Sequence, residues 1–385
     1  MVDIAIRPRC AAAGGPRVHS WATVSQPGIK RGRTCVGRSV TPFDSLVIGA
    51  GQAGLSASHH LRRLGIDHVV LDANEHAGGA WQHRWDSLTM ADVHGVADLP
   101  DAAAPGDSHD RANEVIARWF DDYEQAHDLP VLRPVRVDRV TDVGGMLHVH
   151  AAQRTWVTRT LVNATGTWTH PFVPTYPGQR DFAGEQWHTV AYPGREHFRG
   201  RRVLVVGGGA SAVQFIGELA TIAEITWVTR RPPVWTDEFS GRRAIELVEE
   251  RVREGRPPAS VVSVTGLSLR PQEMAAARTG VYERRRPIFD RIERDGVRWA
   301  DGSFVAADAI LWATGFRPAV RHLAPLGLRS QHGGIALLPG SRDVQTSVTA
   351  ALDPRVQLVG YGPSASTIGG NRAGRAAALA VRAHL

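Results

Sequence analysis

Two stretches of the chain repeat the same order of apolar and polar positions. In the first, the apolar run 45–48 leads into a glycine-rich turn, and apolar residues then recur at helical spacing as far as Leu64. A second apolar run, 68–71, ends in Asp72. Short apolar runs suit buried parallel strands and a 3.6-residue period suits a helix, so this order predicts a strand, a helix and a second strand.

The first turn has the glycine spacing of a dinucleotide-binding loop. Gly49 permits a tight turn, Gly51 lets backbone amides approach a pyrophosphate, and Gly54 allows the helix to pack closely on the strand. The free N–H groups at the helix start, near Gln52, favour a bound phosphate. Asp72 stands near where an acid accepts hydrogen bonds from a ribose. The alternative is a glycine-rich turn in some other α/β protein.

The second stretch repeats this order with small changes in its turn. The apolar run 202–206 is followed by a turn containing Gly207, Gly209, Ser211 and Ala212, and an apolar helical pattern begins at once. Ala212 replaces the third glycine, which moves the helix slightly away from the strand. The turn is therefore predicted to be a second dinucleotide-binding loop.

The strand after the second loop does not end in an acid. The run 224–229 ends in Arg230 and Arg231. An acid would accept from a free 2′-hydroxyl and repel a 2′-phosphate, whereas guanidinium groups pair with that phosphate. The second unit is therefore predicted to bind NADPH rather than NADH.

Two Ala-Thr-Gly sequences, at 164–166 and 313–315, each follow an apolar strand pattern. Hairpin-like alternation precedes each of them, at 145–158 and 296–304. In the large group of flavoproteins that carry FAD on a first unit and a nicotinamide nucleotide on a second, such sequences resemble the crossing points between the two domains. Gly166 and Gly315 would allow sharp bends there.

This resemblance implies an α/β fold with two Rossmann-like dinucleotide-binding domains, the NADPH domain being inserted into a discontinuous FAD domain. The expected boundaries are 42–168 and 306–385 for the FAD domain, 169–305 for the NADPH domain, and 1–41 for a preceding extension. That extension is expected to be disordered or to reflect a start assigned too far upstream, with an arginine-rich targeting peptide as the alternative.

Charge does not point to nucleic acid, although the net charge is +7 and the pI is about 10.2. Most of the excess lies in the first 42 residues, which contain Arg7, Arg9, Arg17, Lys30, Arg31, Arg33 and Arg38 against the single acid Asp3. The rest is nearly neutral and lacks the basic patch of a nucleic-acid binder. No apolar run reaches the ~18 residues of a membrane span, so membrane insertion is not expected.

Cysteine occurs only at Cys10 and Cys35. A structural disulfide or a redox pair is therefore not expected from residue 43 onward, which fits a reducing cytoplasm. The same fact excludes enzymes that relay electrons through a cysteine pair beside a flavin. The 17 histidines show no metal-ligand spacing, so no metal site is predicted.

Residues 182–193, FAGEQWHTVAYP, match the pattern F-x-G-x-x-x-H-x-x-x-W/Y-P/D. This pattern resembles the fingerprint of the flavin-containing monooxygenases, and it lies just before the second loop, as in that family. Gly78-Gly79-Ala80-Trp81 and Trp85-Asp86-Ser87-Leu88 look like the GGxW and (Y/W)DSL elements that contact FAD in that family. The size of the chain resembles that of the short bacterial and YUCCA-like members.

The resemblance implies that FAD takes hydride from NADPH, reacts with O2 to form a C4a-(hydro)peroxyflavin, and oxygenates a small organic substrate at nitrogen, sulfur or a carbonyl carbon. No catalytic side chain is expected, because the cofactor carries the chemistry. His188 is expected to organise the domain junction. Residues 89–94 lack an asparagine that many members carry there, and Asp92 and His94 are the polar residues in its place.

Three alternatives stay open. The protein could be an NADPH-dependent reductase or oxidase that passes electrons to a quinone, a carrier protein or O2 without oxygenation. It could instead be a flavin-binding sensor without enzymatic activity. Residues 182–193 could also be a linker in which Phe182, Trp187 and Tyr192 pack. The sequence predicts neither the substrate nor the oligomeric state.

Overall fold

The structure is a computed structural model that describes residues 41–93, 96–236, 241–255, 266–331, 333–340 and 347–385. All of these residues fall within one compact unit. The expectations for residues 1–40 and for His94 lie outside the described residues. In the described part of the chain, no helix has both the length and the apolar character needed to cross a membrane.

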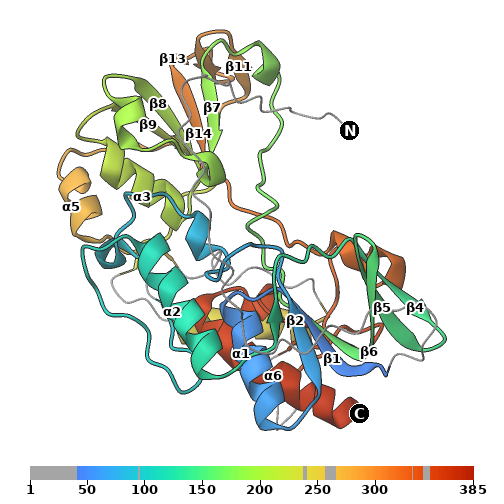
Figure 1. Cartoon of the computed structure of the whole chain (residues 1–385). Helices are drawn as coiled ribbons and strands as arrows, with labels where there is room; N and C mark the ends of the chain where they lie inside the picture. Colours follow the sequence, from blue (N-terminus) through green and yellow to red (C-terminus); the bar gives the residue numbers. More distant parts are fainter. Residues whose placement is uncertain (1–40, 94–95, 237–240, 256–265, 332, 341–346) are drawn as a thin grey trace, which may run out of the picture. The chain divides into compact units, whose positions relative to one another are not determined.

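The first sheet has seven strands in the order β3-β2-β1-β6-β5-β4, with β15 also paired to β6 (Figure 1). The strands are β1 (Phe43–Ile48), β2 (His68–Leu71), β3 (Val131–Leu132), β4 (Arg139–Val143), β5 (Met146–Ala151), β6 (Arg154–Asn163) and β15 (Val356–Leu358). Strands β1, β2, β3, β6 and β15 pair in parallel, whereas β4, β5 and β6 form an antiparallel meander.

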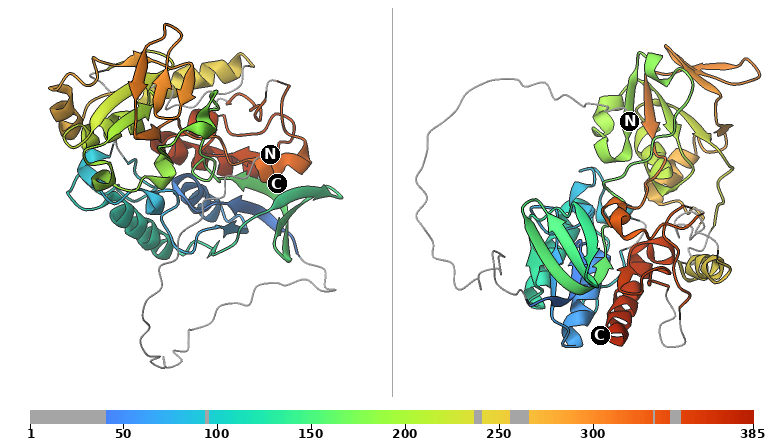
Figure 2. Two further views of the ribbon diagram at one scale, coloured as in Figure 1. Left: turned by 90° about the horizontal axis from the view of Figure 1, so that it is seen from above. Right: turned by 90° about the vertical axis from the view of Figure 1, so that its right-hand side faces the viewer.

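Burial along the strands explains this division. Strand β2 is buried at every position, as in a parallel strand covered on both faces. Strand β5 alternates between buried and half-buried residues, because its meander has only one face on the core. The helices of this part are α1 (Gln52–Arg63), α2 (Ala112–Ala126) and α6 (Thr367–His384). Helix α6 packs along α1, so helices from opposite ends of the described chain lie side by side (Figures 1 and 2).

The second sheet is fully parallel and has the order β10-β9-β8-β14-β7. Its strands are β7 (Glu185–His188), β8 (Arg202–Val206), β9 (Glu224–Thr229), β10 (Arg286–Pro287) and β14 (Ala309–Trp312). Helices α3 (Ala210–Leu219), α4 (Gly241–Arg253) and α5 (Pro271–Ala277) come from the same stretch of chain. A small antiparallel sheet contains β11 (Arg291–Glu293), β12 (Gly296–Arg298) and β13 (Phe304–Ala306).

The α/β fold with parallel sheets is confirmed. The apolar runs at 68–71, 202–206 and 224–229 form β2, β8 and β9 with the predicted bounds, and both predicted hairpins are present. Strand β7, inside the fingerprint, was not predicted as a strand. The domain boundaries stay predictions. Strand β14 begins after the boundary at 305/306, yet it pairs with β8 and β7 in the second sheet.

Candidate functional site

Both glycine-rich loops open onto one cavity of about 2490 Å³. Sites for a single small ligand usually measure about 300–1,000 Å³, so this cavity has room for more than one large cofactor. It is lined by most of the predicted residues: Gly49, Gly51, Gln52, Asp72, Gly79, Ala80, Trp81, Gly166, Gly207, Gly209, Ser211, Arg230, Arg231 and Gly315. Gly54 and Ala212 are not on its wall; they lie beneath the loops and pack helix against strand.

The first loop leaves several polar groups for a ligand. Gly51 caps α1 without a side-chain hydrogen bond, so N–H groups of the first turn remain for an anion. Gln52 donates its Nε2 to the carbonyl oxygen of Ala97 at 2.6 Å, while its buried Oε1 has no partner within the described residues. A Cβ at Gly79 would lie only 2.8 Å from the Gly51 Cα. Because Gly79 has no side chain, the two backbone segments lie close together and this wall of the cavity is flat. These features fit the pyrophosphate of FAD.

The Asp72 carboxylate accepts hydrogen bonds from two backbone N–H groups. Its Oδ2 accepts from the N–H of Ala50 at 2.6 Å, and its Oδ1 accepts from the N–H of Asn74 at 2.7 Å. The Arg133 Nε lies 3.9 Å from Oδ1, and Arg133 also forms two 2.6 Å hydrogen bonds with Glu124. This buried network therefore fixes Asp72 at the turn where a ribose is expected. The sequence analysis did not identify Arg133 and Glu124 as members of the site.

The second loop has the same construction. Gly209 caps α3 without a side-chain hydrogen bond from any described residue. Arg230 and Arg231 are exposed where β9 ends, at the edge of the cavity. A further arginine joins them, because Arg285 donates its Nη1 to the Thr229 Oγ1 at 2.9 Å. The end of β9 therefore presents positive charge to the cavity.

The first glycine of each loop makes the same contact with the Ala-Thr-Gly sequence of a neighbouring strand. A Cβ at Gly49 would lie 2.6 Å from the carbonyl oxygen of Ala164, and a Cβ at Gly207 would lie 2.2 Å from that of Ala313. Both glycines also have positive φ, of 101° and 142°. No other residue fits either place without moving a strand end. The sequence alone did not indicate that these motifs meet.

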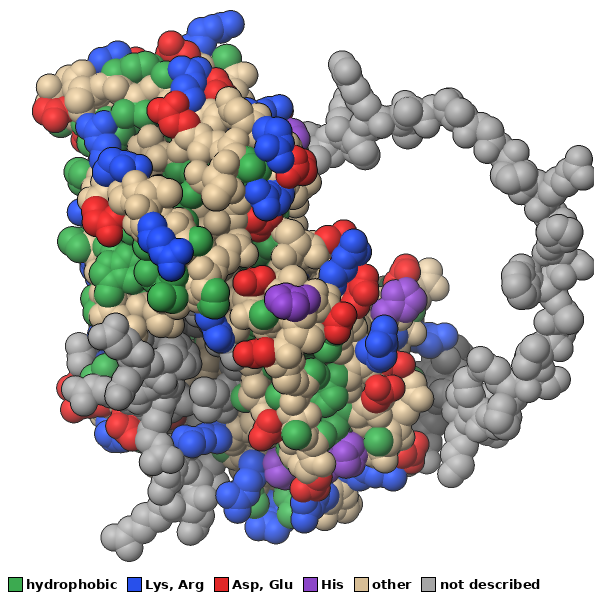
Figure 3. Space-filling model, turned by 90° about the vertical axis from the view of Figure 1, so that its left-hand side faces the viewer, with side chains coloured by type: hydrophobic (Ala, Val, Ile, Leu, Met, Phe, Trp, Pro, Cys, Tyr) green, Lys and Arg blue, Asp and Glu red, His purple; other side chains and the backbone are tan. Residues whose placement is uncertain are grey.

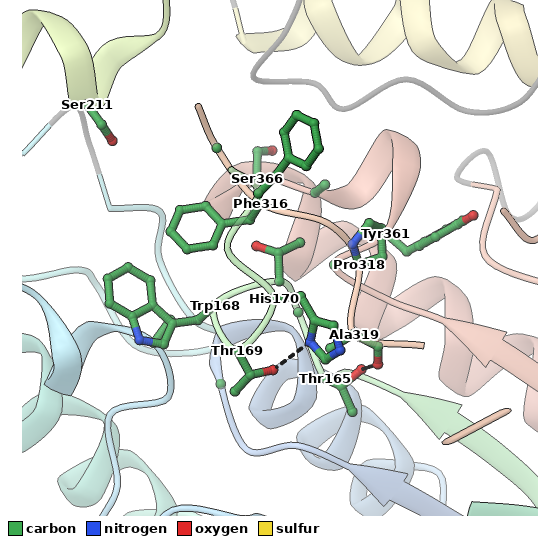
Figure 4. Close-up of a pocket in the computed structure, with 18 of the residues that line it drawn as sticks. Thr165, Trp168, Thr169, His170, Ser211, Phe316, Pro318, Ala319, Tyr361 and Ser366 are labelled. Atoms are coloured by element: carbon green, nitrogen blue, oxygen red, sulfur yellow. Dashed lines mark hydrogen bonds between the residues drawn. The ribbon is translucent and has the colours of Figure 1, made fainter. Parts of the chain in front are cut away.

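The two connections between the sheets are hydrogen-bonded to each other. The N–H of Phe172 donates to the carbonyl oxygen of Gly315 at 2.9 Å, and the N–H of Arg317 donates to that of His170 at 2.8 Å. Gly166 and Gly315 have φ of 59° and 78°, as sharp bends require. Figure 4 shows Trp168 and Phe316, one from each connection, side by side; their ring centroids are 5.2 Å apart. We name residues 170–172 with 315–317 the linker ribbon.

His188 of the fingerprint is bound to this ribbon. Its Nε2 donates to the carbonyl oxygen of Gly315 at 3.1 Å, and its Nδ1 accepts from the N–H of Val190 at 3.4 Å. Burial lowers the pKa of His188, so the imidazole is neutral and both of its nitrogens are engaged. These are the contacts of a residue that organises the junction.

Arg84 is a cation in the cavity wall that the sequence did not single out. Its Cζ lies 4.8 Å from the ring centroid of Trp168 and 5.3 Å from that of Trp81. Burial lowers the pKa of Arg84 to about 10. Across the described ranges no carboxylate pairs with its guanidinium, and its buried Nε has no hydrogen-bond partner. In the sequence, its position between Trp81 and Trp85 was the one feature that could have identified Arg84 as a site residue.

The segment that lacks the family's asparagine also borders the cavity. Leu88 and Val93 line it, whereas the Asp92 carboxylate accepts from the Thr89 Oγ1 at 2.6 Å. Asp92 is therefore held by its own turn. No cluster of three or more potential metal ligands occurs among the residues that the structure describes.

One cavity served by two dinucleotide loops defines an oxidoreductase of the two-nucleotide flavoprotein class. The chain belongs to the pyridine nucleotide-disulphide oxidoreductase family, whose sequence pattern matches residues 46–257. Despite the family's description, both cysteines lie in the first 40 residues, so no cysteine pair is available in the matched region.

Individual relatives narrow the class. The chain is 36% identical to the flavin-containing monooxygenase from Stenotrophomonas maltophilia, with a TM-score of 0.76 and coverage of 89% of this chain and 99% of that one. It is 26% identical over 305 residues to the uncharacterized oxidoreductase CzcO of Bacillus velezensis (76% of this chain, 87% of the relative). It is 26% identical over 318 residues to the indole-3-pyruvate monooxygenase YUCCA1 of Oryza sativa subsp. japonica (72% and 77%).

The resemblance to flavin-containing monooxygenases, including bacterial and YUCCA members, is therefore confirmed. The protein is a flavin-dependent oxidoreductase of a family that binds FAD and a nicotinamide nucleotide.

The matched glycine contacts predict separable effects on the two cofactors. Gly49→Ala should bind FAD about 5- to 150-fold more weakly, because the clash costs about 1–3 kcal/mol. Gly207→Ala should retain FAD but weaken the nicotinamide nucleotide by a similar factor. FAD content by absorbance and nucleotide affinity by titration measure the two effects, and each variant is the control for the other. Loss of FAD in both variants would contradict the assignment of the loops.

Proposed function

We propose that this protein is an NADPH-dependent FAD monooxygenase that oxygenates a small organic substrate at nitrogen, sulfur or a carbonyl carbon. The observation that carries the proposal is the single cavity shared by both loops and bordered by the linker ribbon, to which the fingerprint's His188 is bound. The Stenotrophomonas and rice relatives, both named as monooxygenases, support it.

FAD, when bound, would supply the redox chemistry: it accepts hydride from NADPH and activates O2, so that one oxygen atom enters the substrate and the other leaves as water. The chain binds and orients. The N-termini of α1 and α3 would hold the two pyrophosphates, and Gly51 and Gly79 would let the first cofactor lie against the backbone. The stacked rings of Trp168 and Phe316 on the cavity wall would exclude water near the junction when the cofactors are bound.

The preference for NADPH rests on charge at the end of β9. Arg230 and Arg231 are exposed at the cavity edge, and Arg285 is held beside them by Thr229. No ion pair to an acid engages Arg230 or Arg231 among the described residues. Their guanidinium groups are therefore available to a 2′-phosphate, which NADPH has and NADH lacks.

For the substrate, Arg84 favours a molecule that combines an aromatic ring with a carboxylate. An unpaired, desolvated guanidinium is costly, and a carboxylate is its geometrically matched partner. Trp81 and Trp168 flank it with flat apolar surface. The rice relative's name specifies indole-3-pyruvate, which has both groups.

Oxygen transfer is tested with purified holoenzyme, NADPH and ¹⁸O₂. With an aromatic 2-oxo acid, an aliphatic sulfide and a tertiary amine as probes, mass spectrometry should find one ¹⁸O atom in at least one product, and H2O2 should account for less than the NADPH consumed. Stoichiometric H2O2 with every probe, or transfer of all electrons to a quinone, would contradict the monooxygenase and support the reductase or oxidase.

The nucleotide preference is tested with the double variant Arg230→Ala/Arg231→Ala. One charge-assisted hydrogen bond contributes about 1.5–3 kcal/mol, so loss of both arginines should raise the KM for NADPH by at least about 10-fold. The KM for NADH should change by less than about 3-fold, which serves as the internal control. An equal rise for both nucleotides would show that the pair does not contact the 2′-phosphate.

The role of Arg84 is tested with Arg84→Met, which keeps length and apolar packing but removes the charge. The KM for an aromatic carboxylic acid substrate should rise about 10- to 100-fold, because one charge-assisted hydrogen bond is lost. The KM for its methyl ester should hardly change. A similar change for acid and ester, or loss of FAD or of NADPH affinity, would assign Arg84 to a cofactor instead.

A further inference from the structure

Three sequence motifs meet at one buried carboxylate that no motif contains. Glu218 lies near the end of α3, the helix that begins at the second glycine loop, and is only 7% exposed. Its Oε1 accepts from the Oγ of Ser87 at 2.7 Å and from the hydroxyl of Tyr192 at 3.1 Å. Ser87 belongs to the WDSL element after the first loop, and Tyr192 belongs to the fingerprint.

Burying the Glu218 carboxyl in an apolar helix face costs free energy unless hydrogen bonds compensate for the lost water. The neighbouring buried positions of α3 include Phe215, Ile216 and Leu219, so Glu218 interrupts an apolar face. Burial raises the pKa of its carboxyl, and the hydrogen bonds from Ser87 and Tyr192 oppose that rise. A buried carboxyl is tolerated when it accepts hydrogen bonds, and the Oε1 of Glu218 accepts two.

The contacts around Glu218 attach one segment to α3. The ring centroid of Trp85 lies 4.8 Å from that of Phe215, and Gln214 of α3 donates its Nε2 to the carbonyl oxygen of Asp92 at 3.2 Å. Residues 85–93 are thus held to α3 at both of their ends. Two members of that segment, Leu88 and Val93, line the cavity, whereas Glu218 itself does not.

We propose that Glu218 is a positioning residue for hydride transfer. Glu218 accepts hydrogen bonds from both Ser87 and Tyr192. It thereby fixes α3, the helix that follows the second glycine-rich loop, against residues 85–93, which border the cavity. The inference rests on the proposed two-cofactor function, because it concerns the distance between the nucleotides bound at the two loops. Reacting atoms must approach within about 3–3.5 Å, and a 1 Å misplacement costs on the order of 100-fold in rate.

The test compares Glu218→Ala with Glu218→Gln in the FAD-loaded protein. Stopped-flow absorbance under anaerobic conditions gives the limiting rate of flavin reduction and the Kd for NADPH. Glu218→Ala should lower the limiting rate about 10- to 100-fold, with FAD content unchanged and Kd altered by less than about 3-fold. Glu218→Gln keeps a carbonyl oxygen that accepts both hydrogen bonds, so its rate should stay within about 3-fold of the wild type.

Two smaller changes guard against misfolding of the alanine variant. Ser87→Ala and Tyr192→Phe each remove one hydroxyl, and each should slow reduction by itself. In combination with Glu218→Ala they should add little, because the interaction is already lost. Glu224→Ala is the matched control, because Glu224 is an exposed acid on β9, the strand after α3. This substitution should leave the rate of flavin reduction unchanged.

A wild-type reduction rate in Glu218→Ala would overturn the proposal. So would a Glu218→Gln variant as slow as Glu218→Ala, because negative charge rather than the hydrogen bonds would then matter. If Glu218→Ala loses FAD, the proposal falls unless Ser87→Ala or Tyr192→Phe slows reduction with FAD retained. If neither NADPH nor NADH reduces the wild type, the proposed function itself fails, and this inference fails with it.

Discussion

The architecture depends on two backbone contacts of one kind. At each loop, the absence of a side chain on the first glycine lets the chain pass against the carbonyl oxygen of an alanine at the end of a neighbouring strand. This contact aligns the strand end with the helix N-terminus that follows the loop. The helix can then direct its free N–H groups into the cavity, so phosphate binding depends on a packing constraint made before any ligand arrives.

The fingerprint is explained by the same geometry. Its acid and its base do not form a pair, because Glu185 pairs with His197 and Arg201 whereas His188 forms its hydrogen bonds with backbone groups. Instead, His188 holds the linker ribbon through Gly315, and Tyr192 contacts Glu218 on the helix of the second loop. Phe182 fills the core of the second sheet. Phe182, His188 and Tyr192 are spaced so that β7 and the turn after it contact the sheet core, the linker ribbon and α3 in turn. The fingerprint is thus a structural motif that joins parts of the cavity wall.

Local pattern was sufficient to predict the strands on either side of both glycine-rich turns. The strand patterns predicted β2, β8 and β9 to the residue. Burial is continuous along β2 and nearly so along β8, which leaves a continuous apolar record in the sequence. Strand β7 left no such record: its sequence, EQWH, lies at a sheet edge, where polar residues are tolerated. Arg84 and Glu218 were missed for another reason. Their importance lies in contacts with distant residues, such as Ser87 with Glu218, which no local period reveals.

The linker ribbon also limits how the protein can move. If the two connections were independent, the backbone of each could change separately, and the second sheet could move against the first in several directions. Two backbone hydrogen bonds join these connections, from Arg317 N–H to the His170 carbonyl oxygen and from Phe172 N–H to that of Gly315, so a change in one is passed to the other. A rotation of one sheet against the other would therefore have to change the backbone dihedrals next to Gly166 and Gly315 together, as in a hinge. Opening for exchange of a spent nucleotide would be one concerted rotation, and its rate would set an upper limit on turnover.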